Sequence, residues 1–241
     1  MNIEKHGGSL GDSRILLGLA LKYGPLFAVA SFALATPAIV HRGWQLLMLW
    51  PAVSLGVVAA GYLSIGPRVF GKSERGTLTP ISQLLLLPYL LTLWTLWHVL
   101  RLVRSAPAVS QLTENIWIGR RLLSHELPDE ITHVVDLTCE FNEPAELRQR
   151  SYFSFPILDG ASATPDQLRI WAKTVADLPG NVFIHCAEGH GRTGLFAAAV
   201  LLYRGDATSP EEALSSVQSK RARVRLGREQ LAVLREAYST P

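Results

Sequence analysis

Long apolar stretches without a single charge dominate the first hundred positions of the chain. A helix that crosses a bilayer needs roughly 20 mainly apolar residues, and tryptophan and tyrosine favour its ends. Prolines interrupt all of these stretches, which membrane helices tolerate better than soluble helices do. Helices buried in a soluble bundle would instead show polar positions every few residues. The pattern therefore predicts two to three membrane helices, at residues 23–40, 44–65 and 81–97.

The third stretch has two interpretations, because Pro88 stands in its middle. It either crosses the bilayer or lies in the interface. The positive-inside rule places the amino terminus in the cytoplasm, since Lys5, Arg14 and Lys22 precede the first stretch and only Arg42 separates the first two. Three crossings would then put the second half of the chain outside. An interfacial third stretch would keep it inside.

From about residue 106 the pattern changes to short apolar or β-branched runs that alternate with amphipathic ones. Short runs bounded by turn residues are typical of strands, and a cap residue followed by proline is typical of a helix start. Alternating strands and helices predict an α/β fold, in which helices flank a central, mostly parallel sheet. We expect a membrane region over residues 1–104 and a catalytic domain over 105–241. The expected strands are 115–119, 131–138, 152–157 and 181–185, and the expected helices are 164–178, 193–204, 208–221 and 228–238.

Charge divides the chain at the same place. Residues 1–104 carry nine Lys/Arg against three Asp/Glu, whereas the rest carries fourteen against seventeen. The basic pI near 9.0 therefore comes from the apolar half, which favours contact with an anionic membrane surface over nucleic-acid binding. Two cysteines exclude a disulfide scaffold and a cysteine-rich metal site. No metal or cofactor is predicted.

The candidate chemistry lies in the stretch VFIHCAEGHGRTG, residues 182–194. Cys186 ends a buried strand and a helix begins near Thr193, which is where open parallel sheets place their ligands. Backbone N–H groups at the start of a helix can surround an oxyanion and lower the pKa of a thiol. Gly189 and Gly191 permit the close approach, and the Arg192 guanidinium can hold two phosphate oxygens.

These features predict phosphoryl transfer to cysteine, with the oxyanion held by Ala187, Glu188, Gly189, His190, Gly191 and Arg192. The Thr193 hydroxyl is expected to stabilise the sulfur anion. The leaving group needs a proton, and Asp159 is the candidate general acid, because it follows a strand at the same sheet edge. Such an acid contributes about 10² to 10⁴ in rate.

HCAEGHGRTG matches the Cys-x5-Arg-Ser/Thr signature, and the chain resembles the protein tyrosine phosphatase superfamily in its dual-specificity branch. The similarity covers most of residues 114–240, and its last part resembles the phosphatidylglycerophosphate phosphatase type. The resemblance implies that Cys186 is the nucleophile, Arg192 the phosphate binder and Asp159 the general acid. It also implies a phosphocysteine intermediate and no metal.

The variable loop positions depart from the pattern of lipid and phosphoinositide phosphatases, which carry lysine or arginine there. Glu188 either selects against polyphosphorylated head groups or points to solvent, and His190 either contacts a substrate or stays at the rim. His185 is expected to support the loop rather than transfer protons.

Two further features have alternative interpretations. Cys139 either forms a reversible disulfide with Cys186 or is a small buried apolar residue. The basic run 220–225 either contacts anionic lipid or is a solvated helix end, and we favour the helix end.

The sequence thus predicts a membrane-anchored, cysteine-dependent phosphatase that acts on phosphoprotein or on a singly phosphorylated lipid. The alternative is a catalytically silent phosphate-binding module that recruits partners to the membrane. A catalytic thiolate persists best in a reducing compartment, so we expect the catalytic domain in the cytoplasm. The substrate's identity and the oligomeric state stay open.

Overall fold

The computed structural model describes residues 10–238, with side chains from Tyr23 onward. Lys5, which enters the orientation argument, lies outside the described residues, as do the side chains of Arg14 and Lys22. The first half of the chain is helical, as expected. Its elements are α1 (Leu10–His41), η1 (Gly43–Met48), α2 (Leu49–Ala60), the single π-helical turn η2 (Gly61–Ile65), η3 (Gly66–Phe70) and α3 (Pro80–Val103).

Three segments of this half are long and apolar enough to cross a membrane, namely Tyr23–His41, Gly43–Phe70 and Pro80–Val103. This confirms the three predicted apolar helices. Local sequence explains where α3 begins, because the Thr79 side chain accepts a hydrogen bond from the backbone N–H of Ser82 and Pro80 occupies the first turn.

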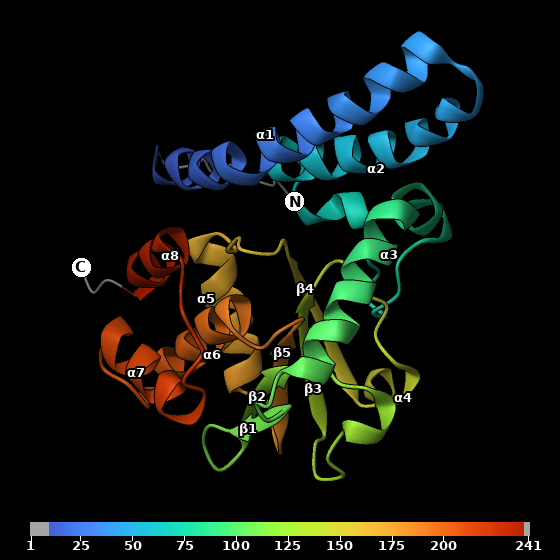
Figure 1. Ribbon diagram of the computed structural model, residues 1–241. Helices are drawn as coiled ribbons and strands as arrows, with labels where there is room; N and C mark the ends of the chain where they lie inside the picture. Colours follow the sequence, from blue (N-terminus) through green and yellow to red (C-terminus); the bar gives the residue numbers. More distant parts are fainter. Residues whose placement is uncertain (1–9, 239–241) are drawn as a thin grey trace, which may run out of the picture.

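The three helices differ in what they contact. α1 and α2 lie side by side, and α2 also packs against α3, where Trp50 Nε1 donates to the Leu84 carbonyl at 3.1 Å. α3 then runs along the half of the chain that contains the sheet (Figure 1). One face of α3 is buried, and the opposite face is apolar and at least half exposed. The buried residues are Leu86, Leu90 and Trp97, and the exposed ones include Ile81, Leu84, Leu91, Val99 and Leu102.

The second half is an α/β unit, as predicted. Its five strands are arranged in the order β1-β2-β5-β3-β4, and all neighbours are parallel except β1 and β2. The short antiparallel β1 was not expected from the sequence. The strands are β1 (Val109–Gln111), β2 (Ile116–Arg120), β3 (His133–Thr138), β4 (Ser151–Ile157) and β5 (Val182–Cys186).

Helices cover the sheet unevenly. α5 (Pro165–Ala176), α6 (Gly191–Arg204), α7 (Pro210–Lys220) and α8 (Arg228–Tyr238) lie together beside the sheet in Figure 1. They share the main core with Val135 and Ile184 of the central strands. The short η4 (Ser124–Glu126) and α4 (Ala145–Arg148) lie on the other side. There Phe183 packs in a smaller cluster with Leu147.

The loop between η3 and α3 joins the two halves of the chain. The Lys72 side chain is fully buried, and its Nζ bonds Asp136 Oδ2 and donates to Thr138 Oγ1 at 2.8 Å. The Tyr152 hydroxyl also donates to Asp136, at 2.7 Å. The charge of a residue between the apolar helices is therefore satisfied inside the sheet half. The composition of the chain changes at the predicted boundary, residue 104. The two halves on either side of this boundary nevertheless pack tightly against each other.

Candidate active site

Cys186 lies at the carboxyl end of β5 and is buried, with only 3% of its surface exposed. The backbone N–H of Gly189 donates to its sulfur at 3.3 Å. Gly189 has a φ of +70°, and a Cβ there would come within 2.4 Å of the Gly119 backbone. Both the backbone conformation and the lack of space therefore require glycine at this position. The loop curls over the cysteine before α6 begins at Gly191.

Arg192 is held by a carboxylate that the sequence analysis missed. Its Nη1 donates to Glu140 Oε2 at 3.1 Å and its Nη2 to Glu140 Oε1 at 2.7 Å. Nη1 also donates to the carbonyl of Ile157 at 2.9 Å. Burial by itself would raise the pKa of Glu140, but the charge and hydrogen bonds of Arg192 leave that pKa below its usual value. The guanidinium is thus fixed in one orientation by a bidentate partner.

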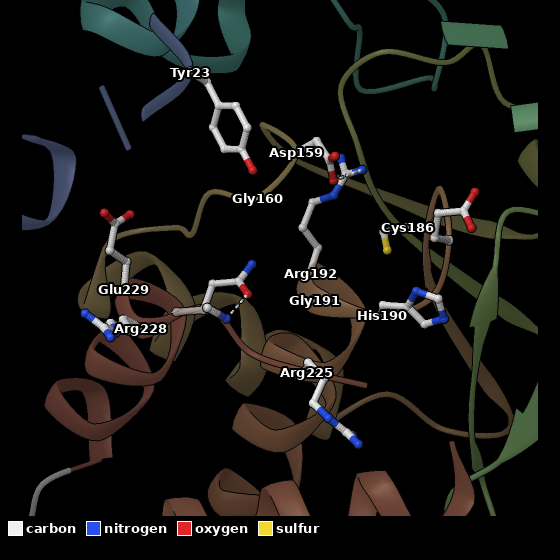
Figure 2. Close-up of a pocket in the computed structure, with 13 residues that line it drawn as sticks. Tyr23, Asp159, Gly160, Cys186, His190, Gly191, Arg192, Arg225, Arg228 and Glu229 are labelled. Carbon is white, nitrogen blue, oxygen red and sulfur yellow. Dashed lines mark hydrogen bonds and ion pairs between the residues drawn. The ribbon is translucent and has the colours of Figure 1, made fainter. Parts of the chain in front are cut away.

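Asp159 follows β4 and reaches the same site, as its position in the sequence suggested. Its Oδ1 lies 3.2 Å from Arg192 Nη2, and its side chain is 76% exposed. Cys186, Arg192 and Asp159 line one cavity of about 620 Å³. Figure 2 shows the Asp159 carboxylate at the Arg192 guanidinium, with the Cys186 sulfur beside them. The structure therefore brings all three predicted residues together.

Thr193 has a different contact from the one predicted. It is buried, and its hydroxyl donates to the carbonyl of Gly119 in β2 at 3.4 Å. The expected interaction was with the Cys186 sulfur. In the described part of the chain, Thr193 therefore links the start of α6 to β2 by a hydrogen bond.

The variable loop positions face the apolar half of the chain. The Ala187 carbonyl accepts a hydrogen bond from Trp97 Nε1 at 2.9 Å. The Glu188 carboxylate pairs with Arg104, and both side chains are about a third exposed. This pairing differs from the solvent-facing alternative for Glu188. Glu188 also lines the cavity that contains Cys186 and Arg192, and its selection against polyphosphorylated head groups stays a prediction.

Both histidines of the loop have a lowered pKa. His185 is fully buried and stacks on Phe183 with ring centroids 5.2 Å apart. Burial lowers its pKa to about 4. His190 is half-buried and lines the cavity. Burial, followed by the positive charge of Arg221, lowers its pKa to about 4 as well. Both imidazoles are neutral at neutral pH.

Cys139 follows β3, which neighbours β5 in parallel as the disulfide hypothesis assumed. Both cysteines are free. The Cys139 thiol is buried and donates to Glu140 Oε2 at 3.3 Å. Burial and the neighbouring Glu140 charge raise its pKa well above the usual value, so the thiol stays protonated. It packs with Leu86, Leu90 and Leu158 in an apolar cluster. The disulfide stays a prediction.

The basic run 220–225 is not simply a solvated helix end, so the favoured interpretation is wrong for Arg221. This residue is only 6% exposed. Its Nε donates to the Gly189 carbonyl at 2.7 Å and its Nη1 to the Pro107 carbonyl at 2.9 Å. Arg225 lines the active-site cavity. The run thus supports the phosphate loop, and no spacing rule in the sequence indicates this.

The cavity also receives residues from distant parts of the chain that the sequence analysis did not select. Tyr23 of α1 lines it, together with Arg228 and Gln230 of α8. Figure 2 shows the Tyr23 ring pointing from α1 toward Asp159. An apolar helix therefore contributes one wall of the candidate active site.

A buried polar cluster lies behind the nucleophile. Asp136, Glu143 and His185 are of residue types that ligate metals, and their ligand atoms lie within 4.8 Å of one another. Basic side chains supply positive charge beside both carboxylates. Lys72 bonds Asp136, and Arg121 Nε lies 3.3 Å from Glu143 Oε2. Burial, followed by the Asp136 charge, raises the pKa of Glu143 to about 8.

Comparisons with known proteins found a family match for the second half of the chain and several similar solved structures. Residues 122–239 match the PTP-SAK family, described as the Swiss Army Knife protein, DSP-PTPase phosphatase domain. Among solved structures, Tk-PTP in the active form is 27% identical, with a TM-score of 0.50 over 56% of this chain and 99% of that one. Human DUSP28 is 14% identical, with a TM-score of 0.45 over 56% of this chain and 95% of that one. PTPMT1 in complex with PI(5)P is 19% identical, with a TM-score of 0.47 over 55% of this chain and 96% of that one.

No curated protein sequence matches the chain. The family match covers the phosphate loop, Arg192 and Asp159, and it begins after β2 and ends at α8. Residues 122–239 therefore belong to the DSP-PTPase family of phosphatase domains, as the Cys-x5-Arg-Thr motif predicted.

Proposed function

We propose that the chain is a membrane-anchored, cysteine-dependent phosphatase that hydrolyses phosphomonoesters. The observation that supports this most directly is the meeting of Cys186, Arg192 and Asp159 in one cavity. The arginine is already oriented by Glu140. Catalysis of phosphoryl transfer consists mainly of positioning and of stabilising charge on the equatorial oxygens, and this arrangement supplies both.

The reaction would proceed in two steps. The Cys186 thiolate attacks phosphorus, the P–O bond to the leaving group breaks, and Asp159 gives its proton to the departing oxygen. Water then attacks the phosphocysteine, one of its protons passes to Asp159, the P–S bond breaks, and inorganic phosphate leaves. A phosphoryl group bound by Arg192 would replace the contact with Asp159 Oδ1, now at 3.2 Å, and leave that carboxyl facing the leaving group.

The membrane arrangement favours two crossings. Trp97 of α3 donates to the phosphate loop, so α3 at the bilayer centre would draw a polar loop into hydrocarbon, where unpaired backbone groups are very costly. We infer that α1 and α2 cross as a hairpin while α3 lies along the catalytic domain with its apolar face toward lipid. The amino terminus and the catalytic domain would then share the cytoplasmic side.

The substrate is a phosphoprotein or a singly phosphorylated lipid presented near the membrane. Tyr23, which lines the cavity, belongs to a candidate membrane span. This supports binding of the phosphoryl group close to the bilayer surface. A substrate anchored in or recruited to the same membrane would meet the site at high local concentration.

The test uses the full chain in lipid nanodiscs with EDTA present. An aryl phosphate, phosphopeptides and phosphatidylglycerophosphate would be compared in wild type, Cys186→Ser and Asp159→Ala. We expect wild-type turnover, complete loss in Cys186→Ser, and a loss of about 10²-fold or more in Asp159→Ala. Unchanged turnover in Cys186→Ser would refute the mechanism. Phosphate-dependent binding without wild-type turnover would favour the silent binding module.

A further inference from the structure

Three aromatic side chains from the apolar helices donate hydrogen bonds to the three loops of the candidate active site. The Tyr62 hydroxyl donates to the carbonyl of Asp159 at 3.1 Å. Trp94 Nε1 donates to the carbonyl of Glu140 at 3.1 Å, and Trp97 Nε1 to the carbonyl of Ala187 at 2.9 Å. Each acceptor is the general acid itself, the residue that holds Arg192, or the residue after the nucleophile.

Two tyrosines from different elements contact the loop that carries Asp159. Tyr23 and Tyr62 pack together with ring centroids 5.3 Å apart. Gly160, which follows the acid, has a φ of +74°, and a Cβ there would come within 3.2 Å of the Tyr23 ring. The backbone of Asp159 and Gly160 thus lies against two tyrosines, one from α1 and one from η2. Asp159 projects a largely exposed side chain from this fixed backbone.

The contacts at the other two loops are equally specific. Trp97 is buried, and the Arg121 guanidinium lies 5.1 Å from its ring centroid. An indole N–H inside a protein is normally hydrogen-bonded, and here the acceptors are the loop carbonyls of Glu140 and Ala187. The Ala187 carbonyl also accepts from the backbone N–H of Arg121 at 3.3 Å. Because an indole N–H left without an acceptor inside a protein is costly, each tryptophan favours the loop conformation that accepts its hydrogen bond.

We propose that Tyr62, Trp94 and Trp97 are positioning residues through which the apolar helices set the geometry of the phosphatase loops. Tyr62 has the most specific role, because it fixes the backbone of the general acid. This inference rests on the proposed function and deepens it. The apolar half is then part of the catalytic framework as well as an anchor.

The experiment compares leaving groups, because a general acid matters most for a poor one. The full chain in nanodiscs would be assayed with an alkyl phosphate and with an aryl phosphate whose phenol is strongly acidic. We expect Tyr62→Phe to lower kcat/KM, which reports the step in which the leaving group departs, about 10-fold for the alkyl ester and less than 2-fold for the aryl ester, since misplacing a catalytic group by about 1 Å costs up to 10². In the Asp159→Asn background, Tyr62→Phe should cause no further loss.

Tyr89→Phe is the matched control. Tyr89 packs in the same aromatic cluster, with its ring centroid 5.8 Å from Phe27 and 6.1 Å from Phe70. Among the described residues its hydroxyl makes no hydrogen bond to the acid loop, and its variant should leave both rates unchanged. Equal losses of Tyr62→Phe on both substrates, or a further loss in the Asp159→Asn background, would overturn the positioning role. Unchanged rates would overturn it as well.

A second measurement does not depend on turnover. Amide hydrogen exchange over residues 158–163 should be at least several-fold faster in Tyr62→Phe than in wild type and Tyr89→Phe. Identical exchange in all three proteins would refute the positioning of the loop, even if the wild type proves inactive and the proposed function fails. If the wild type has no phosphatase activity but Tyr62→Phe still exchanges faster than wild type, the proposed function is refuted and the positioning of the loop is not.

Discussion

The two halves of the molecule differ in where their large apolar side chains lie: many are exposed in the helical half, and nearly all are buried or half-buried in the sheet half. In the described part of the chain, twenty of the twenty-two exposed large hydrophobic residues lie between Leu26 and Val103, and only Ile170 and Tyr203 lie in the sheet half. The sheet half buries its apolar residues against itself, whereas the helices leave theirs exposed, as the proposed membrane anchor requires.

The junction between the halves combines both kinds of contact. Leu86 and Leu90 of α3 pack in an apolar cluster with Cys139 and Leu158 of the sheet half. Around this cluster lie a buried ion pair at Lys72, a partly exposed ion pair at Arg104 and three aromatic donors. Hydrogen bonds are directional, so these polar contacts favour one relative placement of the halves. The following experiments test this comparison, from the largest expected effect to the smallest.

Replacing Lys72 by methionine should have the largest effect. Asp136 would remain buried without its cation, and breaking a buried pair costs about 3–5 kcal/mol. Thermal unfolding of the full chain in nanodiscs would measure the loss. The double variant Lys72→Met/Asp136→Asn should recover most of it, because no buried charge is then left alone. Equal stability of wild type and Lys72→Met would show that the junction at Lys72 contributes nothing.

Placing an arginine on each exposed apolar surface tests whether the two surfaces face different solvents. Val29 and Ile170 are 67% and 63% exposed, so exposure alone predicts the same outcome for both. Val29→Arg should make the free energy of membrane insertion less favourable by about 2.5–3.5 kcal/mol. Insertion of the segment carrying a glycosylation tag would measure this change. Ile170→Arg should change the free energy of unfolding by less than about 0.5 kcal/mol. Similar small effects at both positions would contradict a lipid-facing α1.

Stability should fall as the pH rises from about 6.5 to 8, because of Glu143. Its pKa is raised to about 8 by burial and by Asp136, so the folded state keeps a proton that the unfolded state has lost. The stabilisation is complete below the unfolded pKa near 4.5 and disappears as the pH passes the folded pKa. One proton changes stability by at most about 1.4 kcal/mol per pH unit, giving a loss of up to about 2 kcal/mol.

Two neighbours set the pH window of this measurement. The lowered pKa of His185, about 4, makes stability rise with pH up to about 6.5, so the decline is clearest above that value. Asp136 has a lowered pKa, with the charge of Lys72 overcoming the effect of burial, and stays ionised throughout. Urea unfolding of Glu143→Gln should show no decline between pH 6.5 and 8. A decline that persists in this variant must come from another group.

Removing the partly exposed pair should have the smallest effect. Arg104→Ala leaves Glu188 about a third exposed, where ion pairs contribute about 0.2–1 kcal/mol. Urea unfolding at low and high salt would detect a difference that shrinks as salt is added. A loss as large as that of Lys72→Met would mean that burial does not distinguish the two ionic contacts.

Local sequence was sufficient for the chemistry of the loop. A strand, a cysteine, five residues, an arginine and a helix start all lie within about fifteen positions, so backbone geometry alone brings Cys186 and Arg192 together. Asp159 followed from the rule that parallel strands end at one sheet edge. The mostly parallel sheet and the apolar helices were likewise predictable, because period and length are properties of contiguous residues.

Tertiary structure decided everything that depends on distant residues. Glu140 holds Arg192 across 52 positions, Arg221 supports Gly189 across 32, and Trp97 reaches Ala187 across 90. No periodicity encodes such pairs, because they depend on strand order and on the face that α3 turns toward the sheet. Hydrophobic length predicts that a helix leaves water. Only packing decides which apolar face meets protein. Here one face of α3 is buried at Leu86, Leu90 and Trp97, while its opposite apolar face stays exposed.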